Sequence, residues 1–295
     1  MSQTDSPGWK LRQAATDATL LIPGAPNALI ARLIERAGFQ AAYLSGAAFS
    51  AGALALPDIG LVTLSELCEE VRRLARSTAL PLVVDADTGF GEAVNVERTI
   101  VELEAAGAAA VQLEDQQLPK RCGHLSGKSL VGAEEMCAKL RAAIAARRDP
   151  SLVILARTDA RGTEGFDAAV RRANAYLAAG ADWVFPEALE SPEEFARFAA
   201  EVRAPLVANM TEFGRSPLLT RDELTKLGYA AALLPVTALR VAMRAVEQAL
   251  ATIAAEGTQR NLLPNMQTRQ ELYDLLGYAG YEARDSGYFH GDAKS

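Results

Sequence analysis

A loose internal repeat constrains the fold of this chain more than any other feature of its sequence. Four segments each consist of a helical run, a glycine and a short apolar run: IERAGFQAAYLS, LEAAGAAAVQLED, YLAAGADWVFPEA and LTKLGYAAALLPV. The glycines are Gly38, Gly107, Gly180 and Gly228, and each stands where a helix would end in the left-handed conformation. The apolar runs are continuous, as in strands that are buried on both faces of a parallel sheet. The pattern predicts repeated βα units.

Other apolar runs complete the predicted set of strands. LLIPGA, LPLVVDAD, SLVILARTD and APLVANM alternate with helical stretches. With the repeats they give about eight strand candidates, which fit a closed barrel better than an open, doubly wound sheet. The chain has 295 residues, of which 49% are hydrophobic, and this is enough for one large core. We therefore expect an α/β fold over residues 1–295, a single TIM-type (β/α)8 barrel domain with extra C-terminal helices.

Residues 257–295 are predicted to form a C-terminal helical extension beyond what a bare barrel requires. A long helical run over 237–255 precedes it, and a second helical pattern covers 267–276. The extension either packs on its own barrel or makes a dimer contact, in which a helix is exchanged between subunits. The last residues, DSGYFHGDAKS, are typical of a frayed end.

Composition argues against several classes of protein. The formal charge of -7 does not suit a protein that binds nucleic acid without regard to sequence. No run of 18 or more apolar residues predicts a membrane span, and the start of the chain lacks the apolar core of a secretory signal. The 3 cysteines show no CxxC spacing, which is typical of a reducing compartment. We expect a cytoplasmic protein.

Polar residues stand directly after the apolar runs. They are Ser45; Asp85 and Asp87; Glu114 and Asp115; Arg157 and Asp159; Glu187; Asn209 and Thr211. In a barrel these positions share the rim at the carboxyl ends of the strands, where barrel enzymes carry their chemistry. Strands often end in polar loops, but this many in register, mixing carboxylates with an arginine, indicate a functional rim.

Paired aspartates at one strand end predict a metal site. Asp85 and Asp87 are two residues apart in VVDADTGFG, and a period of two points both side chains to one side. A carboxylate-rich site suits Mg²⁺, with Mn²⁺ as an alternative. Glu114 and Asp58 are further candidate ligands, acting through water. Zinc is not favoured, because the chain has 2 histidines and no CxxC pair.

The segment LPKRCGHLSGKSL places a cysteine among cations. The charged or titratable neighbours of Cys122 there are Lys120, Arg121, His124 and Lys128. Nearby positive charge favours the thiolate, and such a thiol can act as a general acid. Gly123 and Gly127 would let the loop bend over a substrate. The alternative is an incidental surface cysteine, whereas Cys68 and Cys137 fall in helical patterns typical of buried, inert thiols.

Several of these motifs together resemble a known family. KRCGH, VDADTGFG, VQLEDQ, ARTDA, FPEA, ANMTEFG and MQTR are similar to segments of the isocitrate lyase and phosphoenolpyruvate mutase superfamily, over about residues 6–288. The match is nearest to the methylisocitrate lyase branch. It implies a magnesium-dependent lyase of propionate catabolism, a homotetramer that cleaves (2S,3R)-2-methylisocitrate to pyruvate and succinate by retro-Claisen/aldol chemistry. Isocitrate lyase, oxaloacetate hydrolase and a non-catalytic metal-binding barrel are the alternatives.

The resemblance also implies roles for individual residues. Asp85 and Asp87 would hold the metal, supported by Asp58 and Glu114, and Cys122 would be catalytic. The implied substrate contacts are Ser45, Gly46, Ala47, Gly123, Arg157, Glu187, Asn209, Met210, Thr211, Arg240 and Arg269. Ala47 replaces a glycine found in many close relatives, and HLSGK replaces the HRPNK of some methylisocitrate lyases, so isocitrate stays an alternative substrate.

The charged residues independently favour a small polyanionic ligand. Arg157, Arg240 and Arg269 can each bind a carboxylate through two hydrogen bonds. Tyr43 could orient the substrate or take its hydroxyl proton, although aromatic residues inside barrels usually only pack. His124 could tune the loop thiol or simply form a hydrogen bond within the loop.

Overall fold

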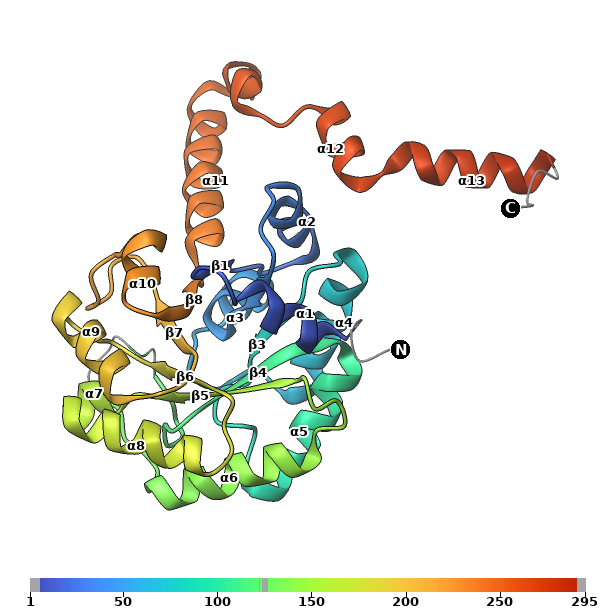
Figure 1. The fold of residues 1–295 in the computed structure, drawn as a ribbon. Helices are drawn as coiled ribbons and strands as arrows, with labels where there is room; N and C mark the ends of the chain where they lie inside the picture. The colour runs from blue at the N-terminus through green and yellow to red at the C-terminus, as the bar shows by residue number, and fades with distance from the viewer. Residues whose placement is uncertain (1–5, 122, 124–126, 291–295) are drawn as a thin grey trace. The chain divides into compact units, whose positions relative to one another are not determined.

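Parallel strands form the centre of the structure, a computed structural model that describes residues 6–121, 123 and 127–290 (Figure 1). The strands are β1 (Leu20–Pro23), β2 (Ala42–Leu44), β3 (Leu82–Asp85), β4 (Ala108–Glu114), β5 (Val153–Thr158), β6 (Trp183–Pro186), β7 (Leu206–Asn209) and β8 (Tyr229–Leu234). In the described chain they form one 8-stranded sheet in the order β1-β8-β7-β6-β5-β4-β3-β2. A parallel bridge between Gly24 and Tyr43 joins β1 to β2 and closes the ring. The predicted (β/α)8 barrel is confirmed.

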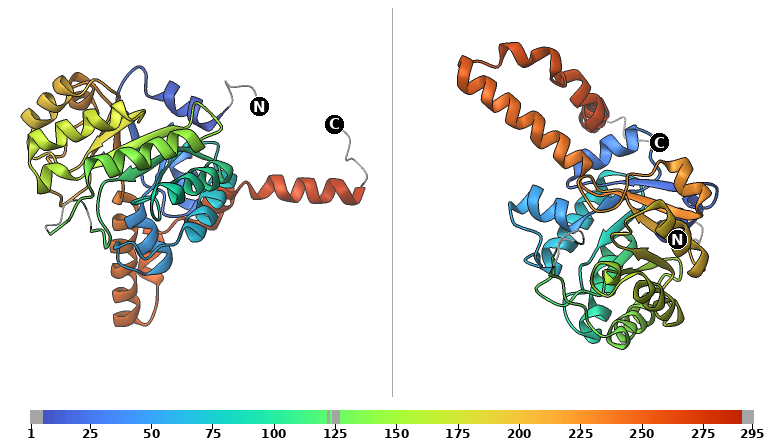
Figure 2. Two further views of the ribbon diagram at one scale, coloured as in Figure 1. Left: turned by 90° about the horizontal axis from the view of Figure 1, so that it is seen from below. Right: turned by 90° about the vertical axis from the view of Figure 1, so that its left-hand side faces the viewer.

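Helices surround the barrel (Figures 1 and 2). In chain order they are α1 (Pro7–Ala14), α2 (Ala28–Arg36), α3 (Gly46–Leu54), α4 (Leu64–Ser77), α5 (Ala93–Ala106), α6 (Ala133–Ala146), α7 (Ala160–Thr163), α8 (Phe166–Ala178), α9 (Pro192–Glu201) and α10 (Arg221–Lys226). Two of them show how the sequence sets their ends. Gly107 ends α5 with φ of 108°, and its N–H bonds to the carbonyls of Leu103 and Glu104. Thr63 and Glu66 form a capping box at the start of α4.

Alternation along the strands separates two cores. Tyr43, Val83 and Phe185 belong to the cluster that fills the barrel, together with Leu11 from α1. The intervening residues, such as Val84 of β3, pack outwards in the cluster shared with the helices. Both faces of each strand are therefore buried, which explains why the strands are continuous apolar runs in the sequence.

The chain divides into two compact units, one ending at Leu239 and the other beginning at Arg240. The second unit contains most of α11 (Thr237–Glu256), the 3-10 helix η2 (Arg260–Asn265), α12 (Arg269–Leu276) and α13 (Tyr278–His290). Within it α12 and α13 are in contact, and the rings of Tyr273 and Tyr278 stack with 4.6 Å between their centroids. No described helix is both long and apolar enough to span a membrane.

Candidate active site

The carboxyl ends of the strands carry a connected rim of buried polar side chains. The Glu114 N–H donates to the Asp87 carbonyl at 2.9 Å, which joins the end of β4 to the loop after β3. Glu114 pairs in register with Arg157 of β5, and the Arg157 guanidinium lies 3.1 Å from Glu187 Oε2. Asn209 Nδ2 donates to both Glu187 oxygens at 3.2 Å. Residues predicted to share one rim are therefore in contact.

Asp85 is fixed by four hydrogen bonds. Its Oδ2 accepts from the Tyr43 hydroxyl and the Gly46 N–H, each at 3.2 Å. Its Oδ1 accepts from Gln112 Nε2 at 3.0 Å and from the Asp87 N–H at 3.2 Å. Gln112 was not predicted as a site residue, but it stands two positions before Glu114, so strand alternation points it to the same side.

Asp85 and Asp87 converge beside Gly46. A Cβ atom on Gly46 would lie 3.2 Å from Asp85 Oδ2 and 3.3 Å from Asp87 Oδ1, so a larger residue would disturb both carboxylates. The predicted convergence is present, but strand alternation is the wrong reason for it. β3 ends at Asp85, and Asp87 has φ of 49°, in the left-handed region. The contact comes from an Asx turn, in which Asp85 accepts from the Asp87 N–H.

Lys120 places a cation within this acidic group. Its buried ammonium pairs with Asp58 Oδ1 and lies 2.6 Å from Asp87 Oδ1. Burial lowers the pKa of Lys120, but the surrounding carboxylates, with Glu114 the strongest, raise it above its ordinary 10.5. The sequence identified Lys120 only as a neighbour of Cys122, because its contact with Asp58 joins segments that are 62 residues apart.

Two carboxylates of the group have buried oxygens with little compensation: Asp87 Oδ1 pairs with Lys120, and Glu114 Oε1 accepts no hydrogen bond from the described residues. Burial and the neighbouring Asp85 raise the pKa of Asp87 from 3.8 to about 6. Burial also raises the pKa of Glu114 well above 4.5, although Arg157 acts in the opposite direction. These groups resist ionisation unless a cation compensates them.

The acidic group fits a magnesium site with water ligands. Among the described residues, no three His, Cys, Asp or Glu side chains form a group that could hold an ion by themselves. Magnesium rarely needs such a cage, because it usually keeps several waters and binds one or two carboxylates. The unbonded Glu114 Oε1 suits this arrangement, and so does the convergence of Asp85 and Asp87 beside Gly46.

Arg157 is buried among three carboxylates. Its Nε and Nη2 atoms donate to Asp159 at 3.0 and 3.2 Å, and Glu187 and Glu114 pair with it at 3.1 and 3.3 Å. The guanidinium lies over the Phe185 ring, 5.2 Å from its centroid. Burial lowers the pKa of Arg157, but the three carboxylates raise it well above 12.5. A cation held this rigidly is suited to orient one carboxylate of a bound acid.

The segment after β4 returns to the rim. An antiparallel bridge joins Gln116 to Leu130, and the Gln116 amide bonds to both the N–H and the carbonyl of Arg121 at 2.9 Å. Gly123 packs against the rim, since a Cβ atom there would lie 2.5 Å from Glu187 Cγ. The described part of this segment therefore touches the residues that surround Arg157.

Tyr43 is poorly suited to be a base. Its hydroxyl donates to Asp85 and, at 3.0 Å, to Gln112 Oε1. Burial, followed by the charge of Asp85, raises the pKa of Tyr43 well above 10.0. The structure therefore favours the orienting role over proton abstraction.

Ser45, another predicted site residue, begins α3. Its hydroxyl accepts from the Ala48 N–H at 3.3 Å and so caps the helix.

The other predicted residues divide into three groups. Cys122 and His124 lie outside the described residues, so their roles stay predictions. Arg240 and Arg269 belong to the second unit, and their contacts with substrate stay predictions too. The third group lies near the rim: Ala47 is in α3, and directly after β7 Met210 is buried and Thr211 half-buried.

The two cysteines predicted to be inert are buried in helices. Cys68 is in α4 and Cys137 in α6, and burial raises the pKa of each thiol.

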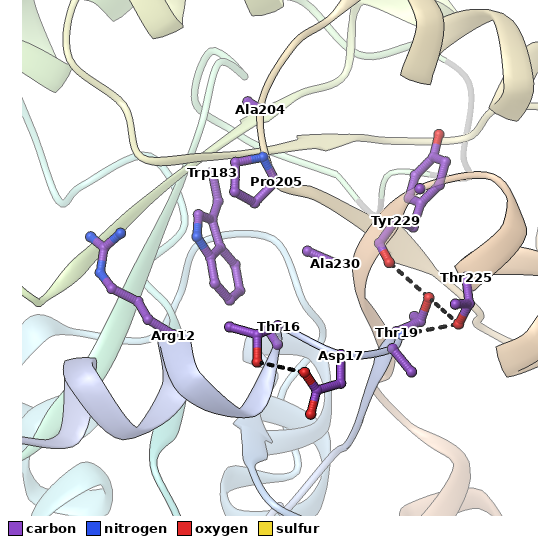
Figure 3. Close-up of a pocket in the computed structure, with 13 residues that line it drawn as sticks. Arg12, Thr16, Asp17, Thr19, Trp183, Ala204, Pro205, Thr225, Tyr229 and Ala230 are labelled. Carbon is purple, nitrogen blue, oxygen red and sulfur yellow. Dashed lines mark hydrogen bonds between the residues drawn. The ribbon is translucent and has the colours of Figure 1, made fainter.

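A separate cavity of about 510 Å³ lies at the amino ends of the strands (Figure 3). Trp183 and Tyr229, the first residues of β6 and β8, line it together with Thr19. The Thr19 hydroxyl is already used, because it donates to the Tyr229 carbonyl at 2.7 Å. Barrel enzymes carry their chemistry at the opposite end, and this cavity shares no residue with the rim.

Known proteins of similar sequence and structure identify the family of this chain. The phosphoenolpyruvate phosphomutase family model matches residues 11–254. The chain is 53% identical to 2-methylisocitrate lyase of Aeropyrum pernix over 283 residues, or 96% of this chain and 91% of that protein. The structure of 2,3-dimethylmalate lyase, a PEP mutase/isocitrate lyase superfamily member, matches with a TM-score of 0.90 and 32% identity over 96% of this chain and 95% of that chain. Phosphonopyruvate hydrolase with oxalate and Mg²⁺ matches with a TM-score of 0.87 and 33% identity over 96% of this chain and 99% of that chain. The chain belongs to the phosphoenolpyruvate mutase and isocitrate lyase superfamily.

Proposed function

We propose that this chain is a magnesium-dependent lyase that cleaves 2-methylisocitrate to pyruvate and succinate. The observation that carries the proposal is the 53% identity, over 96% of the chain, to a protein named 2-methylisocitrate lyase. The rim supports it, because a carboxylate group suited to a divalent cation lies beside the buried Arg157. A divalent cation bound there, together with Arg157, would hold a small polyanion in a protein of net negative charge.

Magnesium is the proposed cofactor, with manganese as an alternative. A structural relative, phosphonopyruvate hydrolase, was solved with oxalate and Mg²⁺. Asp85 and Asp87 would hold the ion here, and Asp58 and Glu114 would act through water. When bound, the ion would lower the pKa of the substrate hydroxyl and neutralise the adjacent carboxylate.

The protein residues would bind and orient the substrate. Arg157 would bind a carboxylate of the substrate, and Glu187 holds Arg157 in place. The other proposed contacts are Ser45, Gly46, Ala47, Gly123, Asn209, Met210, Thr211, Arg240 and Arg269. Hydrogen-bond donors among them would stabilise the negative charge that develops on the departing succinate fragment.

In the proposed reaction, the bond between the hydroxyl-bearing carbon and its neighbour breaks. The hydroxyl proton goes to a base, and the hydroxyl oxygen becomes the keto oxygen of pyruvate. The electron pair of the broken bond moves to the succinate carbon, which takes a proton from the Cys122 thiol. His124 would tune that thiol. A carboxylate of the rim is the remaining candidate for the base, because the raised pKa of Tyr43 disfavours it.

We further propose that the protein is a cytoplasmic homo-oligomer, a tetramer in which residues 257–295 are exchanged between subunits. Met243, Val246, Leu250 and Ile253 are exposed on α11. Their spacing of three and four residues puts them on one face of the helix, as in helices that pack against another helix. Light scattering should give the mass of an oligomer, and a monomer at micromolar concentration would contradict this part of the proposal.

Parallel assays with the two tricarboxylates test the function. Pyruvate release from 2-methylisocitrate and glyoxylate release from isocitrate would be measured with Mg²⁺ present. A higher kcat/KM for 2-methylisocitrate is expected. One methyl group is worth about 1–3 kcal/mol in a pocket, so a preference of about 5- to 150-fold is the expected range. A higher kcat/KM for isocitrate would replace the proposed substrate, and turnover of neither acid would contradict the lyase assignment.

A further inference from the structure

Lys128 connects the segment after β4 to the end of β5. Its ammonium donates to Asp159 Oδ1 at 2.6 Å and also to the Gly123 carbonyl. The side chains of Lys128 and Asp159 are 2% and 0% exposed. Burial of the Lys128 ammonium costs it its hydration. Only pairing with a charge and hydrogen bonding can offset that cost, and Lys128 has both.

The carboxylate that Lys128 binds is the one that holds Arg157. Asp159 Oδ2 accepts from Arg157 Nε at 3.0 Å, while Oδ1 accepts from Arg157 Nη2 at 3.2 Å and from Lys128 at 2.6 Å. Asp159 is itself anchored, since its N–H donates to Asp115 Oδ1 at 2.9 Å. It stands at the N-cap of α7 but makes no capping bond with its side chain. Its carboxylate is therefore used for the two cations.

Lys128 and Arg157 share one acceptor, Asp159 Oδ1, and this affects where the Arg157 guanidinium lies. The Nη2 atom lies between two competing acceptors, Asp159 Oδ1 at 3.2 Å and Glu187 Oε2 at 3.1 Å. Oδ1 also accepts the shorter bond from Lys128, so the ammonium competes with Nη2 for this oxygen, whereas Nε has Oδ2 to itself within the Asp159 carboxylate. The Arg157 Nη2 atom therefore stays close to Glu187, at the place where Gly123 packs against both residues.

We infer that Lys128 is a positioning residue that aligns Arg157 through Asp159 and links this alignment to the segment that carries Cys122. The inference rests on the proposed function, in which Arg157 binds a substrate carboxylate. Without Lys128, Asp159 Oδ1 would no longer be shared, and it would draw Arg157 Nη2 closer than the present 3.2 Å and away from the substrate. The Gly123 carbonyl would also lose its bond to the ammonium.

A double-mutant cycle tests the route through Asp159. Lys128→Met should lower kcat/KM by about 10- to 100-fold, the range for residues that hold a ligand-binding group in place. In an Asp159→Asn background the same change should cost less than about 3-fold, because the route is already broken. Lys226→Met removes an exposed lysine from α10 and is the matched control, with kcat/KM unchanged. An equal loss in both backgrounds, or no loss in the single variant, would overturn the inference.

A second readout does not depend on turnover. Lys128→Met should speed trypsin cleavage after Arg121, measured by mass spectrometry of the fragments under native conditions. The melting temperatures of Lys128→Met and Lys226→Met would exclude global unfolding as the cause. Unchanged cleavage would contradict the link to the segment after β4. If the parent protein cleaves neither tricarboxylate, the proposed function fails, but this proteolysis still decides whether Lys128 anchors the segment.

Discussion

Replacing Asp87 by asparagine should stabilise the metal-free protein at neutral pH. Burial and Asp85 raise the pKa of Asp87 from 3.8 to about 6. The difference of about 2 units, at about 1.36 kcal/mol per unit, corresponds to a penalty of about 3 kcal/mol for the ionised carboxylate. Asparagine avoids that penalty, which already includes the opposing contact with Lys120. Because the amide does not reproduce every contact of the carboxylate, about 3 kcal/mol is an upper limit for the gain.

The sign of the pH dependence follows from proton binding. Between pH 3.8 and about 6 the folded protein keeps a proton on Asp87 that the unfolded chain has released, so the stability of the parent falls as pH rises through this window. The advantage of Asp87→Asn should therefore be complete above about pH 6 and vanish below about pH 4. Urea unfolding with EDTA, repeated across this range, measures it.

Two comparisons make the measurement decisive. Asp17→Asn changes an exposed aspartate in the same way and should leave the difference from the parent near zero at every pH. Mg²⁺ should reverse the order of stability, because an ion at about 1,000 times its dissociation constant stabilises the parent by about 4.1 kcal/mol and Asp87→Asn much less. An Asp87→Asn protein that is no more stable than the parent at neutral pH without metal would refute the reasoning.

Three further predictions concern turnover. Cys122→Ser should lower kcat by about 10²- to 10⁴-fold while Mg²⁺ binding is kept, and Cys68→Ser, which changes a buried thiol of α4, should not; equal losses would remove Cys122 as the acid. Gly123→Ala should lower kcat/KM by about 5- to 150-fold, since overpacking against Glu187 costs about 1–3 kcal/mol, and a parent-like value would show that Gly123 does not need to approach the rim. EDTA should abolish turnover and Mg²⁺ or Mn²⁺ should restore it; activity that persists in EDTA would exclude the metal role.

Local patterns were enough to predict the barrel. Each of the predicted apolar runs contains one of the observed strands, because a parallel strand buried on both faces needs a continuous apolar segment. Gly107 ends α5 in the left-handed conformation, as its position between a helical and an apolar run predicted. The rim followed from the barrel, since parallel strands that begin at one end must also finish together.

Contacts between distant segments could not be predicted in the same way. Lys128 and Asp159 are 31 residues apart, and the sequence showed only a lysine near a cysteine and an aspartate after a strand. Lys120 was similarly identified for its charge and not for its partner Asp58. Asp87 shows a subtler limit: its spacing from Asp85 is compatible with strand alternation, but a left-handed residue brings the two carboxylates together.

The junction between β1 and β2 lies beside the carboxylates of the rim. β1 and β2 meet through one isolated bridge at Tyr43, whose carbonyl accepts the Ala25 N–H at 2.8 Å. The same tyrosine supports Asp85 through its hydroxyl. Transient separation of these two strands would therefore loosen a carboxylate proposed to hold the metal. Hydrogen exchange of the Ala25 amide is thus a direct reporter of how firmly the cation-binding group is held.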